Sequence, residues 1–152
     1  MYSKEEKKQL VHTFWELFDK YCNSIPGLKE RKKKWILYNT GVSRVDLKFE
    51  PGRKNAKVMI EINHRNEARR LELFEKIEAY KLIIEQDFPE GLIWDFAFIR
   101  DNGQEVCRIY TQLDNVDFHR QKQWPEIYAF MAENMLKLER NFLEIRELLL
   151  AD

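Results

Sequence analysis

The chain has 152 residues, which is enough for one domain with a hydrophobic core and too few for two ordinary domains. Hydrophobic residues at 44% exclude a disordered chain, and no apolar run approaches the roughly 20 residues of a membrane-spanning helix. The net charge is zero, but residues 29–70 hold 13 basic and 5 acidic side chains, whereas residues 71–152 hold 9 and 17. We therefore expect one soluble, cytoplasmic domain over residues 1–152, with no membrane contact and a basic middle segment.

The first predicted element is a helix from about residue 4 to residue 23. Ser3 and Glu6 have the spacing of a capping box, in which each side chain pairs with a free backbone N–H at the helix start. Apolar residues then recur at helical spacing, starting with Leu10 and Phe14, and predict one strongly apolar face. Pro26 ends this helix, and the charged run of residues 29–34 follows it.

Residues 35–63 are predicted to form a three-stranded meander with strands at 35–38, 42–50 and 57–63. The last two strands alternate apolar and polar residues, the pattern of an antiparallel strand with one buried and one solvated face. Asn66 then has the position of an N-cap. An apolar stripe predicts a helix of about 20 residues that continues towards Phe88 and lies on the sheet.

Two further strands, over residues 92–100 and 104–111, flank a hairpin turn at Asn102-Gly103. A helix from about Trp124 closes the chain, with Pro125 tolerated in its first turn. Its apolar residues alternate steps of three and four and form a seam like that of a coiled coil, made of Tyr128, Met131, Met135, Leu138, Phe142, Ile145 and Leu149. The free end of this seam is a candidate contact for a homodimer.

Together these elements predict an α+β fold in the order α-β-β-β-α-β-β-α. We expect one mostly antiparallel five-stranded sheet packed by helices, with a long C-terminal helix. Cys22 lies in a helical pattern and Cys107 in a strand pattern, so we expect both to be reduced, buried thiols.

One pattern in the sequence has catalytic character: Asp46 on one strand, with Glu61 and Asn63 on the next. Two carboxylates on adjacent strands can hold a divalent cation against a phosphate, and this resembles the metal-dependent nuclease pattern of Asp followed by Glu-x-Lys. The lysine is missing, and Asn63 cannot supply its charge. The other interpretation is that both acids are ordinary polar-face residues of a half-solvated sheet. Their partners would then be Arg44, Lys48 and Lys57.

The sequence predicts no resident metal ion and no cofactor. Asp46 and Glu61 could be joined by His64 as metal ligands, but a second histidine is missing, and neither Cys-x-x-Cys nor His-x-x-x-His occurs. A Gly-x-Ser-x-Gly motif and a glycine-rich phosphate loop are also absent from the sequence.

Nucleic-acid binding has a broader basis in the sequence. The candidate phosphate contacts are the basic residues Arg31, Lys32, Lys33, Lys34, Arg53, Lys54, Arg65, Arg69 and Arg70. Trp35 and Tyr38 are available to stack on bases. These cations converge only if the turns and the start of the second helix lie on one edge of the sheet. Otherwise they form a solvated rim.

Four stretches carry a resemblance that covers nearly the whole chain: MYSKEE followed by Phe14-Trp15 and Phe18, Trp35-Ile-x-Tyr38-x-Thr40-Gly41-Val42, Ile60-Glu61-Ile62-x-His64, and Trp124-Pro125-Glu126. Together they resemble an uncharacterised bacterial family, a domain of unknown function. Its members look like stand-alone proteins of this length or C-terminal parts of longer proteins with nuclease-like or restriction-associated regions. The resemblance implies no activity, cofactor or catalytic set, and only that context points towards nucleic acid.

From these observations we predict a soluble accessory or protein-interaction domain without catalytic activity. Its contact surfaces for an unidentified protein partner would be the helix seam and the basic edge. The alternative is a nucleic-acid-binding module, including a degenerate metal-dependent nuclease-like domain, in a defence or repair setting.

Overall fold

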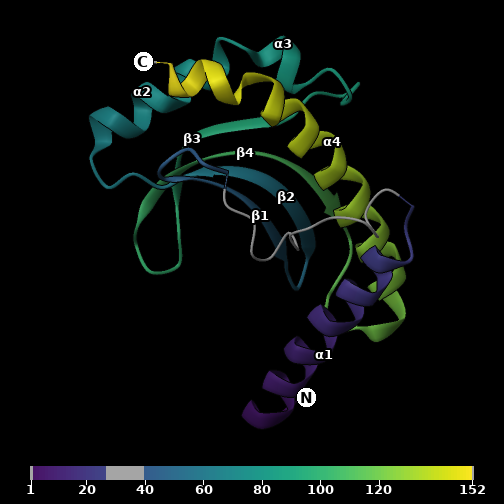
Figure 1. The fold of residues 1–152 in the computed structure, drawn as a ribbon. Helices are drawn as coiled ribbons and strands as arrows, with labels where there is room; N and C mark the ends of the chain where they lie inside the picture. Colours follow the sequence, from purple (N-terminus) through teal and green to yellow (C-terminus); the bar gives the residue numbers. More distant parts are fainter. Residues whose placement is uncertain (1, 27–39, 152) are drawn as a thin grey trace.

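A computed structural model describes residues 2–26 and 40–151 of the chain. The elements are helix α1 (Lys4–Asn23), strands β1 (Val45–Pro51) and β2 (Asn55–Ile62), helices α2 (Glu67–Glu78) and α3 (Lys81–Ile84), strands β3 (Ile93–Ile99) and β4 (Glu105–Asp114), a short 3-10 helix η2 (Gln121–Gln123), and helix α4 (Trp124–Leu150). Figure 1 shows α2, α3 and α4 on one side of a curved sheet. The opposite, concave side carries the polar residues discussed below.

The sheet is built from two antiparallel hairpins placed side by side. The strand order is β1-β2-β4-β3, and each neighbouring pair is antiparallel. Strands β2 and β4 therefore occupy the centre, while β1 and β3 are the edges. The predicted α+β class, antiparallel pairing and long C-terminal helix are confirmed.

The prediction of a five-stranded sheet in the order α-β-β-β-α-β-β-α is wrong, because the described residues form four strands and the additional short helix α3. The strand predicted at 35–38 lies outside the described residues. The strand predicted from residue 42 begins only at Val45, because a turn precedes it. In this turn the buried Thr40 hydroxyl accepts a hydrogen bond from the Val42 N–H (3.1 Å) and donates one to the Val45 carbonyl (2.6 Å). Arg44 adopts a left-handed backbone conformation, with φ at 65°, which a strand does not allow.

The long helix predicted after Asn66 is interrupted. Helix α2 ends at Glu78, and the chain turns at Tyr80 before the short helix α3 begins. No proline or glycine marks this break. The turn lets Ile84 become fully buried, and the carbonyl of Ile84 at the end of α3 accepts a hydrogen bond from the Asn141 side chain of α4 (3.0 Å). Packing against α4 thus overrides the continuous helical pattern.

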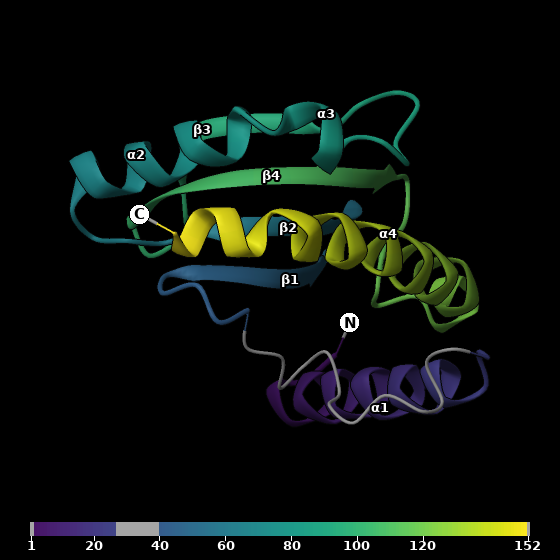
Figure 2. The same cartoon turned by 45° about the horizontal axis from the view of Figure 1, so that its top comes forward.

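Helix α4 runs along the sheet and supplies much of the core (Figure 2). All seven residues of the predicted seam are buried within the domain itself. The seam is therefore already covered by the chain's own sheet and helices, and the predicted homodimer contact gains no support from it. Within the described residues, no helix has both the length and the apolar character needed to cross a bilayer.

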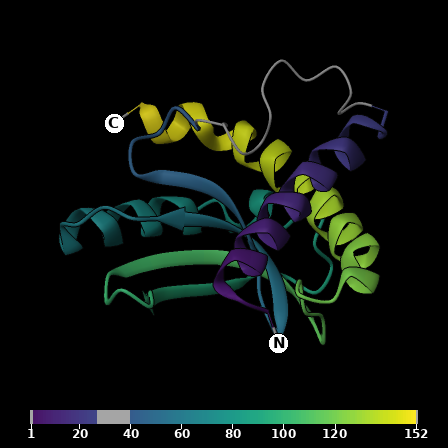
Figure 3. The ribbon, with the colours of Figure 1, turned by 90° about the horizontal axis from the view of Figure 1, so that it is seen from below.

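Helix α1 packs across the first half of α4 (Figure 3). The predicted capping box is present, since the Ser3 hydroxyl accepts from the Glu6 N–H (3.2 Å) and the Ser3 N–H donates to the Glu6 carboxylate (3.4 Å). Fully buried Phe14 lies edge-on to Trp124 (5.3 Å between ring centroids), and the Tyr128 hydroxyl donates to the Phe14 carbonyl (2.6 Å). These contacts anchor α1 next to the turn that starts α4.

The two edge strands differ in character. Strand β1 carries alternating charges and ends in Pro51, features that discourage pairing with another sheet. Strand β3 contains a single charged residue, and its Ile93, Phe96 and Ile99 side chains are exposed. A register shift between Asp95 and Phe98 bends this strand. Strand β3 is thus the more apolar of the two edges.

Candidate functional site

The concave face of the sheet carries a row of charged side chains, one from each strand. Residues that pair directly across antiparallel strands place their side chains on the same face. The register therefore aligns Asp46 of β1, Glu61 of β2, Arg108 of β4 and Asp95 of β3. Asp46 and Glu61 are direct neighbours, as the nuclease-like hypothesis requires.

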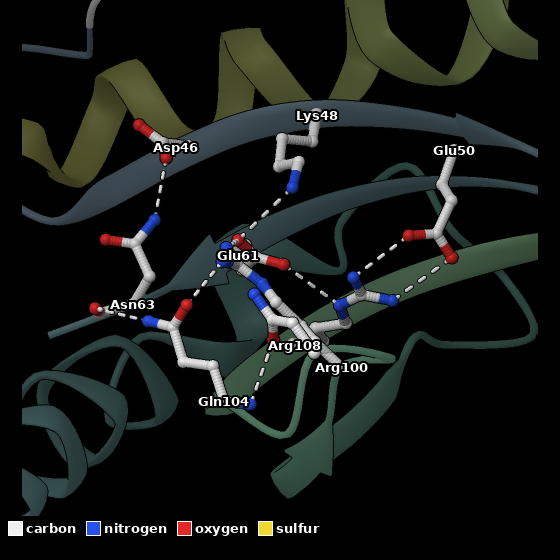
Figure 4. Close-up of polar contacts among 9 residues, drawn as sticks. Asp46, Lys48, Glu50, Glu61, Asn63, Arg100, Gln104 and Arg108 are labelled. Atoms are coloured by element: carbon white, nitrogen blue, oxygen red, sulfur yellow. Dashed lines mark hydrogen bonds and ion pairs between the residues drawn. The ribbon is translucent and has the colours of Figure 1, made fainter. Parts of the chain in front are cut away.

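Glu61 is fully buried and is surrounded by three cations (Figure 4). One carboxylate oxygen accepts hydrogen bonds from the Arg100 guanidinium and from the Lys48 ammonium group (3.4 Å). The other oxygen accepts a hydrogen bond from Nε of Arg108 (3.1 Å). Both oxygens of Glu61 are therefore engaged by positively charged groups from β1, β4 and the turn after β3.

Arg108 extends this network towards Glu50. Its guanidinium is buried, lies over the Phe98 ring (3.9 Å to the centroid), and donates to both Glu50 oxygens (3.2 and 2.9 Å). Lys57 approaches the same carboxylate (3.6 Å). A bidentate arginine–carboxylate pair fixes the orientation of both groups, so the network defines the geometry of the concave face.

The pKa of Glu61 reflects a competition between burial and these cations. Burial raises the pKa, but the hydrogen bond from Arg100 and the charges of Lys48, Arg100 and Arg108 outweigh it, so the pKa is lower than its usual value of 4.5. A carboxylate with a lowered pKa in the folded state stabilises the fold above its unfolded pKa. This contribution is lost as the pH falls through the folded pKa.

Asp46 lies in a different environment from Glu61. It is exposed, and one of its oxygens accepts a hydrogen bond from the Asn63 side-chain amide (2.7 Å). Asn63 thus orients Asp46 with a neutral donor, at the position where the nuclease-like pattern would have a lysine. The Asn63 carbonyl in turn accepts a long hydrogen bond from Gln104 (3.5 Å).

A cavity of about 660 Å³ opens where β1 begins and β2 ends. Its charged lining consists of Arg44, Arg65, Arg100 and Asp46, and Ser43, Asn63 and Gln104 add polar groups. We call it the arginine cavity. A neighbouring cavity of about 560 Å³ shares Arg65 and Gln104 with it. The arginine cavity therefore gathers three positive charges around one carboxylate that is already hydrogen-bonded.

Comparison with known proteins places this architecture in a family. A sequence model described as "Domain of unknown function (DUF4268)" matches residues 10–146, which include all four strands and most of α1 and α4. The chain belongs to the DUF4268 family. Neither the comparison with curated proteins nor the comparison with solved structures found a match. The sequence-based expectation of a domain of unknown function is confirmed.

In this DUF4268 domain the catalytic candidates Asp46, Glu61 and Asn63 come together, but each is already hydrogen-bonded to another residue. Glu61 is enclosed by cations, and Asp46 is held by Asn63. The metal candidate His64 accepts a hydrogen bond from the Asn66 N–H through Nδ1 (3.1 Å). Among residues 2–26 and 40–151, no three His, Cys, Asp or Glu side chains are grouped as a metal ion requires.

The basic candidates for nucleic-acid binding are divided between the two ends of the sheet. Arg53 and Lys54 lie in the turn between β1 and β2, whereas Arg65, Arg69 and Arg70 follow the far end of β2. Arg70 is buried and donates to the His64 carbonyl (3.0 Å) and to Glu105 (3.3 Å), so its role is structural. The candidates at 31–34, namely Arg31, Lys32, Lys33 and Lys34, lie outside the described residues.

Two arginines of the cavity were not predicted from the sequence. The sequence pattern placed Arg44 on the polar face of a strand. Apart from the nearby Gly41, no residue in the sequence indicates that Arg44 has a left-handed backbone conformation. Arg100 follows a strand that is distant in sequence from Glu61, so only the strand order brings the two together. The Asn102-Gly103 pair was the one usable signal, because it predicted a hairpin turn directly after Arg100.

The ion network predicts that Glu61 is needed for stability. Glu61→Gln would remove the carboxylate that pairs with Arg100 and with Nε of buried Arg108, although Arg108 keeps its pair with Glu50. Breaking a buried ion pair costs about 3–5 kcal/mol. Urea unfolding should show a loss of that size in the free energy of unfolding. Asp46→Asn is the matched control, because Asp46 is exposed, and it should cost less than about 1 kcal/mol. Equal effects of the two substitutions would contradict a structural role for the network.

Proposed function

We propose that this domain is a non-catalytic nucleic-acid-binding module that holds the phosphodiester backbone at the arginine cavity. The observation that carries the proposal is the convergence of Arg44, Arg65 and Arg100 on one open cavity. Arginine is well suited to this ligand, because its planar guanidinium can donate two parallel hydrogen bonds to a phosphate and stays charged at all physiological pH values.

The charge balance of the cavity favours an anionic ligand. Arg44 and Arg65 are exposed, and neither forms an ion pair with a carboxylate among the described residues. Arg100 is shared with Glu61, but its buried Nε has no hydrogen-bond acceptor in the described part of the chain. Arg100 nevertheless lines the cavity, whose wall holds three arginines and one carboxylate.

A polymeric ligand fits this region better than an isolated phosphate ion. Arg69 lies exposed in the first turn of α2, four residues after Arg65, so one further cation lies beyond the arginine cavity. The neighbouring cavity shares Arg65 but is also lined by Glu67 and Glu105. The N-terminus of α2, capped by Asn66, adds a positive dipole end to the same region. A second phosphate of the same strand would find Arg69 and this helix terminus next to the arginine cavity.

We infer that the domain is not catalytic because Glu61 cannot bind a metal ion. A carboxylate that holds a divalent metal ion must present free oxygen lone pairs to it. Both oxygens of Glu61 already accept hydrogen bonds from cations, and the side chain is fully buried. The protein partner that the sequence also suggests stays a prediction. The exposed Ile93, Phe96 and Ile99 side chains of the β3 edge are a candidate contact for such a partner.

Binding of fluorescent single- and double-stranded DNA and RNA of about 12 nucleotides, at two salt concentrations, tests the main proposal. We expect salt-dependent binding that the double variant Arg44→Gln/Arg65→Gln weakens about tenfold or more, with a salt slope reduced by about 2 because two phosphate contacts are lost. The control is Lys4→Gln/Lys8→Gln, which removes the same charge from the exposed face of α1. Equal losses in both double variants, or binding that is absent at low salt, would exclude the arginine cavity as the binding site.

Incubation of the same oligonucleotides with Mg²⁺ or Mn²⁺ tests the non-catalytic part of the proposal. We expect no cleavage above the level of a protein-free control, because Glu61 is committed to Arg100, Arg108 and Lys48. Metal-dependent cleavage that Asp46→Ala abolishes would show instead that the domain is an active nuclease.

A further inference from the structure

A second basic cavity lies at the opposite end of the sheet, next to the turn between β1 and β2. It has a volume of about 430 Å³ and is lined by Tyr2, Lys7, Arg53, Asp117, His119 and Arg120. These residues come from three separate segments: the start of α1, the β1–β2 turn, and the connection from β4 to α4. We call it the tyrosine cavity, after the exposed aromatic ring at its rim.

One backbone hydrogen bond and one side-chain hydrogen bond hold the three segments together. The Phe118 N–H donates to the Gly52 carbonyl (3.1 Å), which ties the β4–α4 connection to the β1–β2 turn. The Tyr2 hydroxyl donates to the His119 carbonyl (3.3 Å), which ties the start of α1 to the same connection. The cavity is thus a defined part of the fold and not a chance gap between side chains.

The lining of the tyrosine cavity has more cationic than acidic side chains. Asp117 is the acid in its lining, and its carboxylate is already engaged by Arg53 Nε (3.3 Å) and by the His119 N–H (2.8 Å). Lys7 and Arg120 are exposed, and no described carboxylate pairs with either of them. Two cations are therefore left to meet an anion that enters the cavity.

Aromatic rings form the other part of the wall. The Tyr2 ring lies edge-on to His119 (5.7 Å between centroids), and His119 in turn contacts Phe118 (4.5 Å). Burial and the charges of Arg53 and Lys7 lower the pKa of His119, against the opposing effect of Asp117. The imidazole is therefore neutral at neutral pH and contributes an uncharged ring next to the cations.

We propose that the tyrosine cavity binds a nucleotide unit, with the phosphate at Lys7 and Arg120 and the base against Tyr2. A phosphate needs cationic donors, and a base needs an aromatic surface on which to stack. The cavity places both in one enclosure. The nucleotide can be a free monophosphate or one unit of a nucleic-acid strand, and the site does not depend on the arginine cavity.

Amide chemical shifts of the full chain, followed during titration with inorganic phosphate, adenosine monophosphate or a ten-nucleotide single strand, test this proposal. We expect shifts at Arg53, His119 and Arg120, and binding of the nucleotide about fivefold or more tighter than that of phosphate, because of base stacking. Tyr2→Leu should remove this preference and leave phosphate binding intact. Lys7→Gln/Arg120→Gln should weaken both ligands, whereas the control Lys4→Gln/Lys122→Gln should not.

Comparison of the ligands also shows whether the site takes a free nucleotide or one unit of a nucleic-acid strand. Tighter binding of the single strand than of the monophosphate indicates a nucleic-acid unit, and equal binding indicates a free nucleotide. Arg44→Gln/Arg65→Gln should leave the monophosphate titration unchanged, so failure of the arginine cavity is distinguishable from failure of this site. The proposal is overturned if neither phosphate nor monophosphate shifts these amides, or if Lys7→Gln/Arg120→Gln behaves like its control.

Discussion

The buried carboxylate of Glu61 is the interaction on which the rest of the structure depends. A charge removed from water is costly unless it is paired, and here a single acid is matched by Lys48 of β1, Arg108 of β4 and Arg100 from the turn after β3. The network therefore joins the two hairpins across the sheet. Lys48 and Arg100 reach the same Glu61 oxygen, so the network brings the β3–β4 turn next to β1 and β2.

The same network connects the fold to the proposed binding site. Arg100 neutralises Glu61 and also lines the arginine cavity, where its Nη1 donates to Gln104 (2.6 Å). The acid that could hold a metal is thus withdrawn from the surface, and the arginine that pairs with it lines the proposed phosphate site. Glu61 therefore fixes the position of one of the three arginines on which the proposed site depends.

Much of the fold could be predicted from the sequence, because it is encoded locally. The capping box of α1, the alternation in β2, the Asn102-Gly103 turn and the seam of α4 all correspond to observed elements. The break at Tyr80 and the late start of β1 could not be predicted, because tertiary packing decides them. The interpretation of Glu61 as half-solvated was also wrong, since a strand pattern does not reveal which distant strand supplies Arg108.

The carbon-detected NMR titration of the Glu61 side-chain carboxyl group tests the central claim most directly. We expect this group to be ionised in the folded protein, with a pKa below its usual 4.5, because three cations outweigh the effect of burial. A midpoint above 4.5 would mean that burial dominates and that the carboxyl is not held by Arg100, Arg108 and Lys48. That result would contradict both the structural role of Glu61 and the reason for regarding the site as non-catalytic.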